Sequence, residues 1–163
     1  MKFKKPEFWS NKYSIISLLL MPLSFILILI NFFLKNKKST KFKVPIICVG
    51  NIYLGGTGKT PVAMEIYKIL KKNGKKPAFV KKYYGFVEDE INLLKRIGKV
   101  YTKRKRVDSI LQLSGDKYSH AILDDGFQDS SIEKDLSIIC FHGKQWIGNG
   151  RILPSGPLRE SLK

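Results

Sequence analysis

A glycine-rich stretch between residues 55 and 60 has the residue types that bind a nucleotide phosphate. It reads Gly55-Gly56-Thr57-Gly58-Lys59-Thr60 and lies between an apolar run, residues 44–49, and a helical pattern that starts at Pro61. Glycines let successive backbone N–H groups converge on an anion at a helix N-terminus, where the peptide dipoles favour negative charge. Lys59 is then expected to reach the β- and γ-phosphates, and Thr60 to place its hydroxyl on Mg²⁺.

The stretch therefore predicts a binding site for ATP and Mg²⁺. The expected nucleotide contacts are Tyr53, Leu54, Gly55, Gly56, Thr57, Gly58, Lys59 and Thr60. Tyr53 departs from the phosphate-loop consensus, which has glycine five positions before Gly58. On these residues alone, an ordinary glycine-rich turn remains an alternative.

A second group of chemically active residues follows a short apolar strand, residues 120–124. The strand ends in Asp124 and Asp125, followed by Gly126. Phosphate-loop enzymes hold a metal-coordinating acid at such a strand end, and Mg²⁺ prefers oxygen ligands. Asp124 is the first candidate and Asp125 the second, because the carboxyl edge of a parallel sheet would bring them near the glycine loop. The alternative is a turn in which Asp-Asp-Gly supplies only turn chemistry.

Strands and helices alternate along the chain in the order that builds a parallel sheet covered by helices. Strands are expected at 45–49, 77–81, 99–101, 120–124 and 136–141, and helices at 61–72, 90–96 and 107–113. The predicted fold is an α/β, P-loop NTPase-like parallel sheet with flanking helices. We expect residues 1–43 to form a membrane anchor and residues 44–163 to form the core domain.

The segment from Tyr13 to Leu34 contains 22 uncharged residues. At about 1.5 Å per residue a helix of this length would cover the roughly 30 Å of bilayer hydrocarbon. Pro22 and Asn31 weaken a straight spanning helix, so a helix that lies in the membrane interface stays open as an alternative. Both a spanning helix and an interfacial helix would attach the protein to a membrane.

The chain is strongly basic, with 30 Lys and Arg against 13 Asp and Glu and a net charge of +17. Lysines concentrate on both sides of the apolar segment, at residues 2–12 and 35–43. Such clusters favour an anionic membrane surface. Further clusters at residues 71–82 and 103–106 are expected to form a solvated or membrane-facing basic face. Because no nucleic-acid recognition motif accompanies them, we expect no nucleic-acid partner.

Neither the cysteines nor the histidines have metal-ligand spacing. Cys48 and Cys140 each lie in a predicted apolar strand and are expected to be small core residues in a reducing compartment. His120 and His142 are expected to be structural or exposed.

Taken together, these motifs resemble the tetraacyldisaccharide 4'-kinases of lipid A biosynthesis. The resemblance covers nearly the whole chain as the N-terminal part of such a kinase. Its motifs are Phe8-Trp9, Met21-Pro22-Leu23-Ser24, Val49-Gly50-Asn51-Ile52 leading into residues 55–61, Asp124-Asp125-Gly126-Phe127-Gln128, and residues 148–151 through 156–160. The resemblance implies ATP-dependent phosphorylation of the 4'-hydroxyl of a tetraacyldisaccharide 1-phosphate at the cytosolic face of the bacterial inner membrane.

The resemblance also implies a catalytic carboxylate at Asp89, in the pair Asp89-Glu90. By itself this pair is typical of an acidic helix start, with Asp89 as the N-cap. In the family the residue that matches Tyr53 is usually small and polar. The chain departs from the family's Ser-Arg-Gly-Tyr-Gly-like turn at residues 81–85, and His142 stands where aspartate is usual.

Family members continue past the segment that matches residues 157–160 into a second domain, which supplies a catalytic histidine. Neither His120 nor His142 matches that position. We therefore expect a truncated kinase, and the resemblance leaves open whether a second chain supplies the missing domain. The alternative function is a non-catalytic, membrane-bound, nucleotide-binding protein derived from such a kinase.

Overall fold

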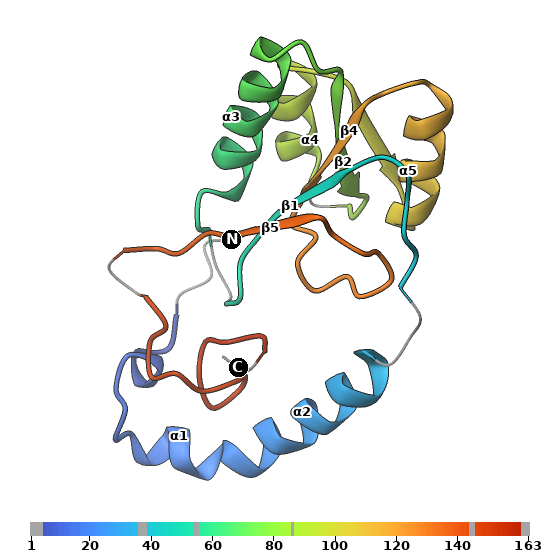
Figure 1. Ribbon diagram of the computed structural model, residues 1–163. Helices are drawn as coiled ribbons and strands as arrows, with labels where there is room; N and C mark the ends of the chain where they lie inside the picture. The colour runs from blue at the N-terminus through green and yellow to red at the C-terminus, as the bar shows by residue number, and fades with distance from the viewer. Residues whose placement is uncertain (1–4, 36–38, 54–55, 86, 144–145, 161–163) are drawn as a thin grey trace. The chain divides into compact units, whose positions relative to one another are not determined.

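The computed structural model describes residues 5–35, 39–53, 56–85, 87–143 and 146–160 (Figure 1). These residues group into two compact units. The sheet unit contains residues 38–50 and 58–140, and the helix–loop unit contains residues 1–37, 51–57 and 141–163. The division of the chain at residue 43 stays a prediction.

The chain forms five strands and six helices over the described residues. In chain order they are η1 (Glu7–Trp9), α1 (Ile15–Leu19), α2 (Met21–Lys35), β1 (Ile46–Gly50), α3 (Lys59–Lys72), β2 (Pro77–Lys82), α4 (Glu88–Lys95), β3 (Val100–Lys103), α5 (Arg106–Gly115), β4 (His120–Asp124) and β5 (Leu136–Ile139).

The five strands form one parallel sheet in the order β3-β2-β4-β1-β5. The predicted parallel sheet with flanking helices is therefore confirmed. Strand ends differ from the predicted ones by up to two residues: β1 begins at Ile46 rather than Pro45, and β5 ends at Ile139 rather than Phe141. Proline is poorly suited to the inside of a strand because it has no N–H to donate.

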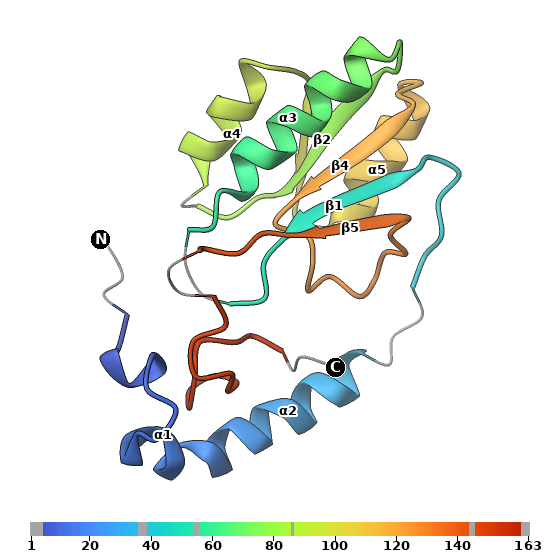
Figure 2. The ribbon, with the colours of Figure 1, turned by 60° about the vertical axis from the view of Figure 1, so that its left-hand side comes forward.

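Helices cover both faces of the sheet, because side chains of a strand point alternately to its two faces. Figure 2 shows α3 and α4 on one face and α5 on the other. Buried residues on the α5 face include Cys48, Val80, Leu123, Ile110 and Leu113. Buried residues on the opposite face include Val49, Phe79, Ile122, Tyr67 and Leu94. The two cysteines are free and buried, as the sequence predicts.

Four buried polar residues join α1 and α2 to the loop at 149–155 within the helix–loop unit. Asn149 donates hydrogen bonds from Nδ2 to Ser17 Oγ at 2.9 Å and to the Ser155 carbonyl at 3.0 Å. Ser24 donates from Oγ to the Ile152 carbonyl at 2.9 Å. The two serines of the apolar segment therefore face protein, where their hydroxyls find partners.

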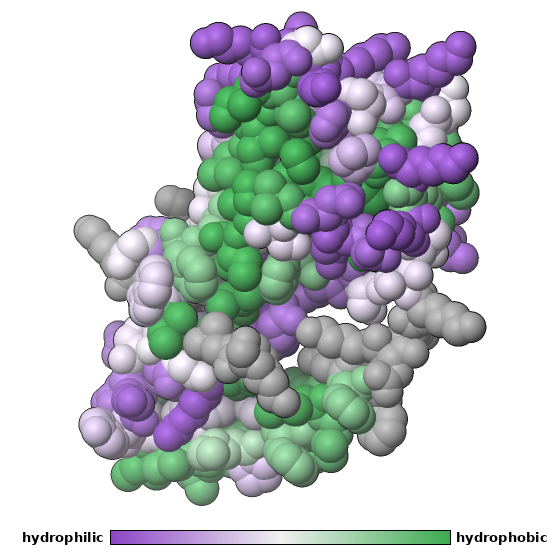
Figure 3. Space-filling model, viewed as in Figure 1, coloured by the Kyte–Doolittle hydropathy of each residue, from purple (hydrophilic) through white to green (hydrophobic). Residues whose placement is uncertain are grey.

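The apolar segment does not form one continuous helix. α1 ends at Leu19 and α2 begins at Met21, because Pro22 has no amide hydrogen to donate to the Leu18 carbonyl. None of the helices in the described ranges is both long and apolar enough to cross a bilayer. Large apolar side chains of both helices remain exposed, among them Leu19 at 75% and Phe25 at 60%; apolar surface is visible on these helices in Figure 3.

The close approach of β1 to the loop after β4 makes Gly50 a sensitive position. A Cβ atom at Gly50 would lie 2.4 Å from the Phe127 Cβ and 3.2 Å from its backbone nitrogen. We expect Gly50→Ala to lower the free energy of unfolding by about 1–3 kcal/mol through overpacking, measured by chemical denaturation. Gly115→Ala is the matched control, since nothing lies within 4 Å of its Cβ. Equal stability of the two variants would contradict this account.

Candidate active site

The glycine loop leads into α3 as the sequence predicts. Gly58 is the N-cap of α3 and has φ +75°, a left-handed conformation that glycine adopts without strain. Lys59 and Thr60 are the first two residues of the helix, where free N–H groups and the helix dipole favour an anion. Gly56 is exposed and Thr57 half-buried. Leu54 and Gly55 lie outside the described residues.

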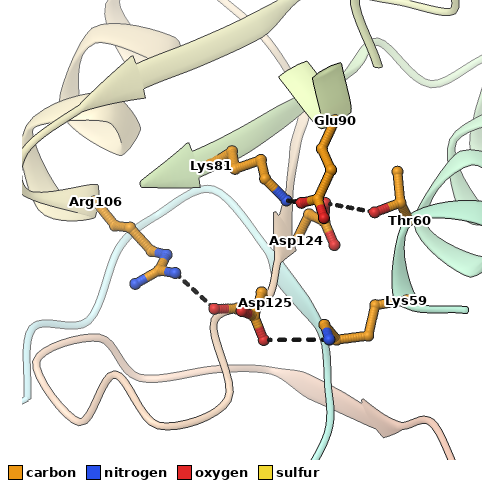
Figure 4. A network of polar contacts seen from close by, with 7 residues as sticks. All are labelled: Lys59, Thr60, Lys81, Glu90, Arg106, Asp124 and Asp125. Atoms are coloured by element: carbon orange, nitrogen blue, oxygen red, sulfur yellow. Dashed lines mark hydrogen bonds and ion pairs between the residues drawn. The ribbon is translucent and has the colours of Figure 1, made fainter. Parts of the chain in front are cut away.

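Asp124 ends β4 and is completely buried. It pairs in register with Val49 of β1, the strand that leads into the glycine loop. Its Oδ2 atom accepts hydrogen bonds from the Thr60 hydroxyl at 3.1 Å and from the Lys81 Nζ at 2.5 Å. Its Oδ1 atom is also buried and has no hydrogen-bond partner within the described part of the chain. Figure 4 shows this arrangement.

Asp125 adopts the left-handed conformation, with φ 59°, which turns the chain away from β4. Its amide donates to the Val49 carbonyl at 2.9 Å, and its carbonyl accepts from Arg106 Nη2 at 2.6 Å. Its carboxylate Oδ1 lies 3.8 Å from Lys59 Nζ (Figure 4). The fold thus brings together Lys59, Thr60, Asp124 and Asp125 at the carboxyl edge of the sheet.

Arg106 and Lys81 are buried, so their assignment to a solvated basic face is wrong. Arg106 is 7% exposed and forms an ion pair with Asp129 at 3.0 Å in addition to its bond to Asp125. It is the first residue of α5, and the apolar pattern that begins at Val107 is the only sequence signal of its burial. Sequence reasoning did not identify Arg106 as a site residue.

Lys81 is 3% exposed near the end of β2 and is the other site residue that sequence reasoning missed. Its Nζ atom contacts Glu90 Oε2 as well as Asp124, each at 2.5 Å. Burial alone would lower the pKa of Lys81, but the Asp124 carboxylate, with help from Glu90, raises that pKa above its ordinary value. The ammonium group is therefore charged at neutral pH.

Asp89 is exposed in the first turn of α4. It is not the N-cap, because α4 begins at Glu88 and Val87 takes the cap position. Of the pair Asp89-Glu90, it is Glu90 that contacts another site residue, Lys81. A catalytic role for Asp89 stays a prediction.

Tyr53 is completely buried in the helix–loop unit. Its hydroxyl accepts a hydrogen bond from the amide of His142, and its ring centroid lies 6.1 Å from that of Phe141. The side chain of His142 is exposed. The expected contact of Tyr53 with a nucleotide stays a prediction.

The donor set at the sheet edge suits Mg²⁺. A hard cation needs oxygen ligands, and Mg²⁺ is usually held by one or two carboxylates together with phosphate oxygens and water. The orphaned Oδ1 of buried Asp124 is such an oxygen, and the Thr60 hydroxyl lies beside the same carboxylate. Among the residues that the structure describes, no cluster of three or more His, Cys, Asp or Glu side chains could hold a metal ion.

Neither cysteine is a candidate nucleophile. Burial raises the pKa of the Cys48 thiol to about 11 and also raises that of Cys140. Because the thiolate is the nucleophile, the raised pKa disfavours reaction of either thiol at neutral pH.

Comparison with known proteins matches a family model to residues 16–163 of the chain. The sequence profile of the tetraacyldisaccharide-1-P 4'-kinases matches residues 16–90 and 85–163. The chain is 47% identical over 163 residues to a tetraacyldisaccharide 4'-kinase of Pelagibacter ubique, covering 99% of this chain and 52% of that protein. It is 37% identical to the tetraacyldisaccharide 4'-kinase of Paramagnetospirillum magneticum, and the match covers 96% of this chain and 54% of that protein. The chain thus spans about half the length of these curated relatives.

A solved structure has the same fold. The crystal structure of LpxK from Aquifex aeolicus in complex with ATP superposes with a TM-score of 0.73 at 28% identity. The match covers 90% of this chain and 55% of that one.

The Arg106–Asp129 pair makes a testable contribution to stability. Burial alone would raise the pKa of Asp129, but hydrogen bonds from Ser131 and Arg106 lower it below its ordinary value. A depressed pKa in the folded state stabilises the fold above the unfolded pKa of about 3.9. That contribution is lost as the pH falls through the folded value.

We expect Asp129→Asn to lower the free energy of unfolding by about 1–3 kcal/mol at pH 6. The difference from the unsubstituted protein should shrink below about pH 4. Denaturant unfolding at pH 3, 4 and 6 measures both effects. Asp108→Asn, which changes an exposed residue of α5, is the control. If Asp129→Asn lowered the free energy of unfolding by the same amount at pH 3, 4 and 6, ionised Asp129 would not be the stabilising group.

Proposed function

The chain belongs to the tetraacyldisaccharide-1-P 4'-kinase family, and on this premise we propose that it binds ATP with Mg²⁺ and transfers the γ-phosphoryl group to a lipid. The acceptor is the 4'-hydroxyl of a tetraacyldisaccharide 1-phosphate, a precursor of lipid A. The observation that carries the proposal is the meeting of Lys59 and Thr60 with Asp124 and Asp125 at the carboxyl edge of the sheet.

Each residue of this edge has a role in the proposed reaction. Lys59 binds the β- and γ-phosphates from the first turn of α3, and backbone N–H groups of the glycine loop bind phosphate oxygens. Thr60 and Asp124 would hold Mg²⁺, with Asp125 as the second carboxylate. The metal would supply positive charge that offsets the negative charge of the phosphates. Asp89 accepts the proton of the attacking 4'-hydroxyl.

We further propose that α1 and α2 lie in the membrane interface at the cytosolic face of the bacterial inner membrane. Their serines face the protein, whereas Leu19, Phe25 and other apolar side chains are exposed. α2 has 15 residues, about 22 Å of helix, which is shorter than the roughly 30 Å of bilayer hydrocarbon. An interfacial helix buries one apolar face in lipid, and the flanking lysines suit anionic headgroups.

A pocket in the helix–loop unit supports a lipid acceptor. It has a volume of about 330 Å³ and is lined by Met21, Phe25 and Ile28 of α2 together with Arg151. Apolar walls beside a guanidinium group suit a molecule that carries both acyl chains and a phosphate.

Transfer of labelled γ-phosphate from ATP to a lipid A disaccharide precursor tests the proposed reaction. In detergent, we expect transfer by the chain and a loss of at least about 100-fold in Lys59→Ala, because Lys59 stabilises the charge of the transferring group. Lys68→Ala removes an exposed lysine of the same helix and should leave the rate unchanged. Undiminished transfer by Lys59→Ala would refute the role of Lys59. ATP binding without transfer would favour the alternative, a non-catalytic nucleotide-binding protein.

Binding to vesicles that contain anionic lipid tests the membrane placement. We expect Leu19→Asp to weaken binding by about tenfold or more, because it removes an apolar side chain from lipid and adds a negative charge. Leu111→Asp, which changes an exposed leucine of α5, is the matched control. Co-sedimentation measures both. Equal binding of the two variants would rule out the proposed lipid-facing side of α1 and α2.

A further inference from the structure

The buried ammonium group of Lys81 lies beside Asp124, the carboxylate to which the proposed function assigns Mg²⁺, and the inference about Lys81 rests on that proposed function. Lys81 lies near the end of β2, and its Nζ atom contacts Asp124 Oδ2 and Glu90 Oε2 at 2.5 Å each (Figure 4). We propose that Lys81 is a positioning residue that sets the affinity of Asp124 for a divalent cation and ties the first turn of α4 to that carboxylate.

Burial makes the pairing of Lys81 with Asp124 obligatory. The side chain of Lys81 is 4% exposed and that of Asp124 is 0% exposed. Either charge alone would be costly to bury, so the two groups hold each other in place. The Glu90 side chain is 54% exposed, so solvent screens its interaction with Lys81 more strongly. Asp124 is therefore the principal partner of Lys81, and Glu90 is the secondary one.

The two oxygens of Asp124 are used differently. Oδ2 accepts from both Lys81 and Thr60, whereas the buried Oδ1 has no partner among the atoms that the structure describes. Two donors on one oxygen fix the rotation of the carboxylate and leave the other oxygen for a cation. Because Thr60 donates to the same oxygen, the carboxylate keeps this orientation when Lys81 is replaced.

The same contact opposes cation binding. A positive charge held 2.5 Å from Oδ2 repels a second cation on the same carboxylate, and this repulsion is strong where solvent is excluded. Glu90 reduces the effect, because its negative charge balances part of the charge on Lys81. Removing Lys81 should therefore tighten cation binding, and neutralising Glu90 should weaken it. A purely structural role of Lys81 would instead weaken binding when Lys81 is removed.

The ion pair between Lys81 and Glu90 also connects α4 to β2. Glu90 lies in the first turn of α4, next to Asp89, which is the proposed proton acceptor. The pair Lys81–Glu90 therefore joins the start of this helix to the edge of the sheet that carries Asp124. Lys81 thus joins the metal-binding carboxylate to the helix turn that carries the proposed acid–base group.

Titration of the full chain with Mn²⁺ tests the proposal, with the free Mn²⁺ signal followed by electron paramagnetic resonance and no nucleotide present. We expect Lys81→Met to bind Mn²⁺ on the order of tenfold more tightly, because the fixed positive charge is gone. Glu90→Gln should bind Mn²⁺ a few-fold more weakly, by roughly threefold. Lys82→Met, which removes the neighbouring lysine of β2, is the matched control and should change the affinity little.

Glu90→Gln keeps the test valid if Lys81→Met does not fold, since it leaves the buried pair intact. The inference is overturned if Asp124→Asn abolishes Mn²⁺ binding while Lys81→Met binds no more tightly than the unsubstituted protein or Glu90→Gln binds no more weakly. If Asp124→Asn binds Mn²⁺ normally, the proposed metal role of Asp124 fails and this inference fails with it. The two failures are therefore distinguishable.

Discussion

The pairing of β1 with β4 is the constraint on which the candidate site depends. Parallel pairing puts Val49 opposite Asp124, so the end of β1 and the end of β4 meet at one edge of the sheet. From that edge one chain segment enters the glycine loop and α3, while the other turns sharply at Asp125. Lys59 and Thr60 then meet the two aspartates without any long side chain reaching across the domain. The register of β1 against β4 thus determines which residues meet at the candidate site.

Buried charges hold this edge in one arrangement. Arg106 binds the backbone of Asp125 and the carboxylate of Asp129, and Lys81 binds Asp124 and Glu90. Each of these cations is buried, so leaving it without its anion would be costly. The turn after β4 is fixed by Arg106, and the carboxylate that ends β4 is fixed by Lys81. Catalysis by electrostatic stabilisation requires groups held in place in this way before the substrate binds.

Polar contacts of a different kind organise the helix–loop unit. Ser17 and Ser24 bind the loop at 149–155, which fixes the side of α1 and α2 that packs against protein. Most apolar side chains of the two helices are exposed. The 22 uncharged residues are compatible with a spanning helix as well as with an interfacial one. Length and hydropathy do not show which groups accept hydrogen bonds from the hydroxyls of Ser17 and Ser24. The break before Pro22 and these hydrogen bonds favour the interfacial alternative.

The sequence by itself determined the features that depend on neighbouring residues. Short apolar runs that alternate with helical patterns identified the five strands, and glycine spacing before Lys59 identified the loop between β1 and α3. Only the tertiary structure decided which charges are buried. Lys81 and Asp124 are 43 residues apart, and Arg106 and Asp129 are 23 residues apart. A buried lysine and a solvated one look alike in a basic sequence, because burial depends on strand order and on which anion the fold places within reach.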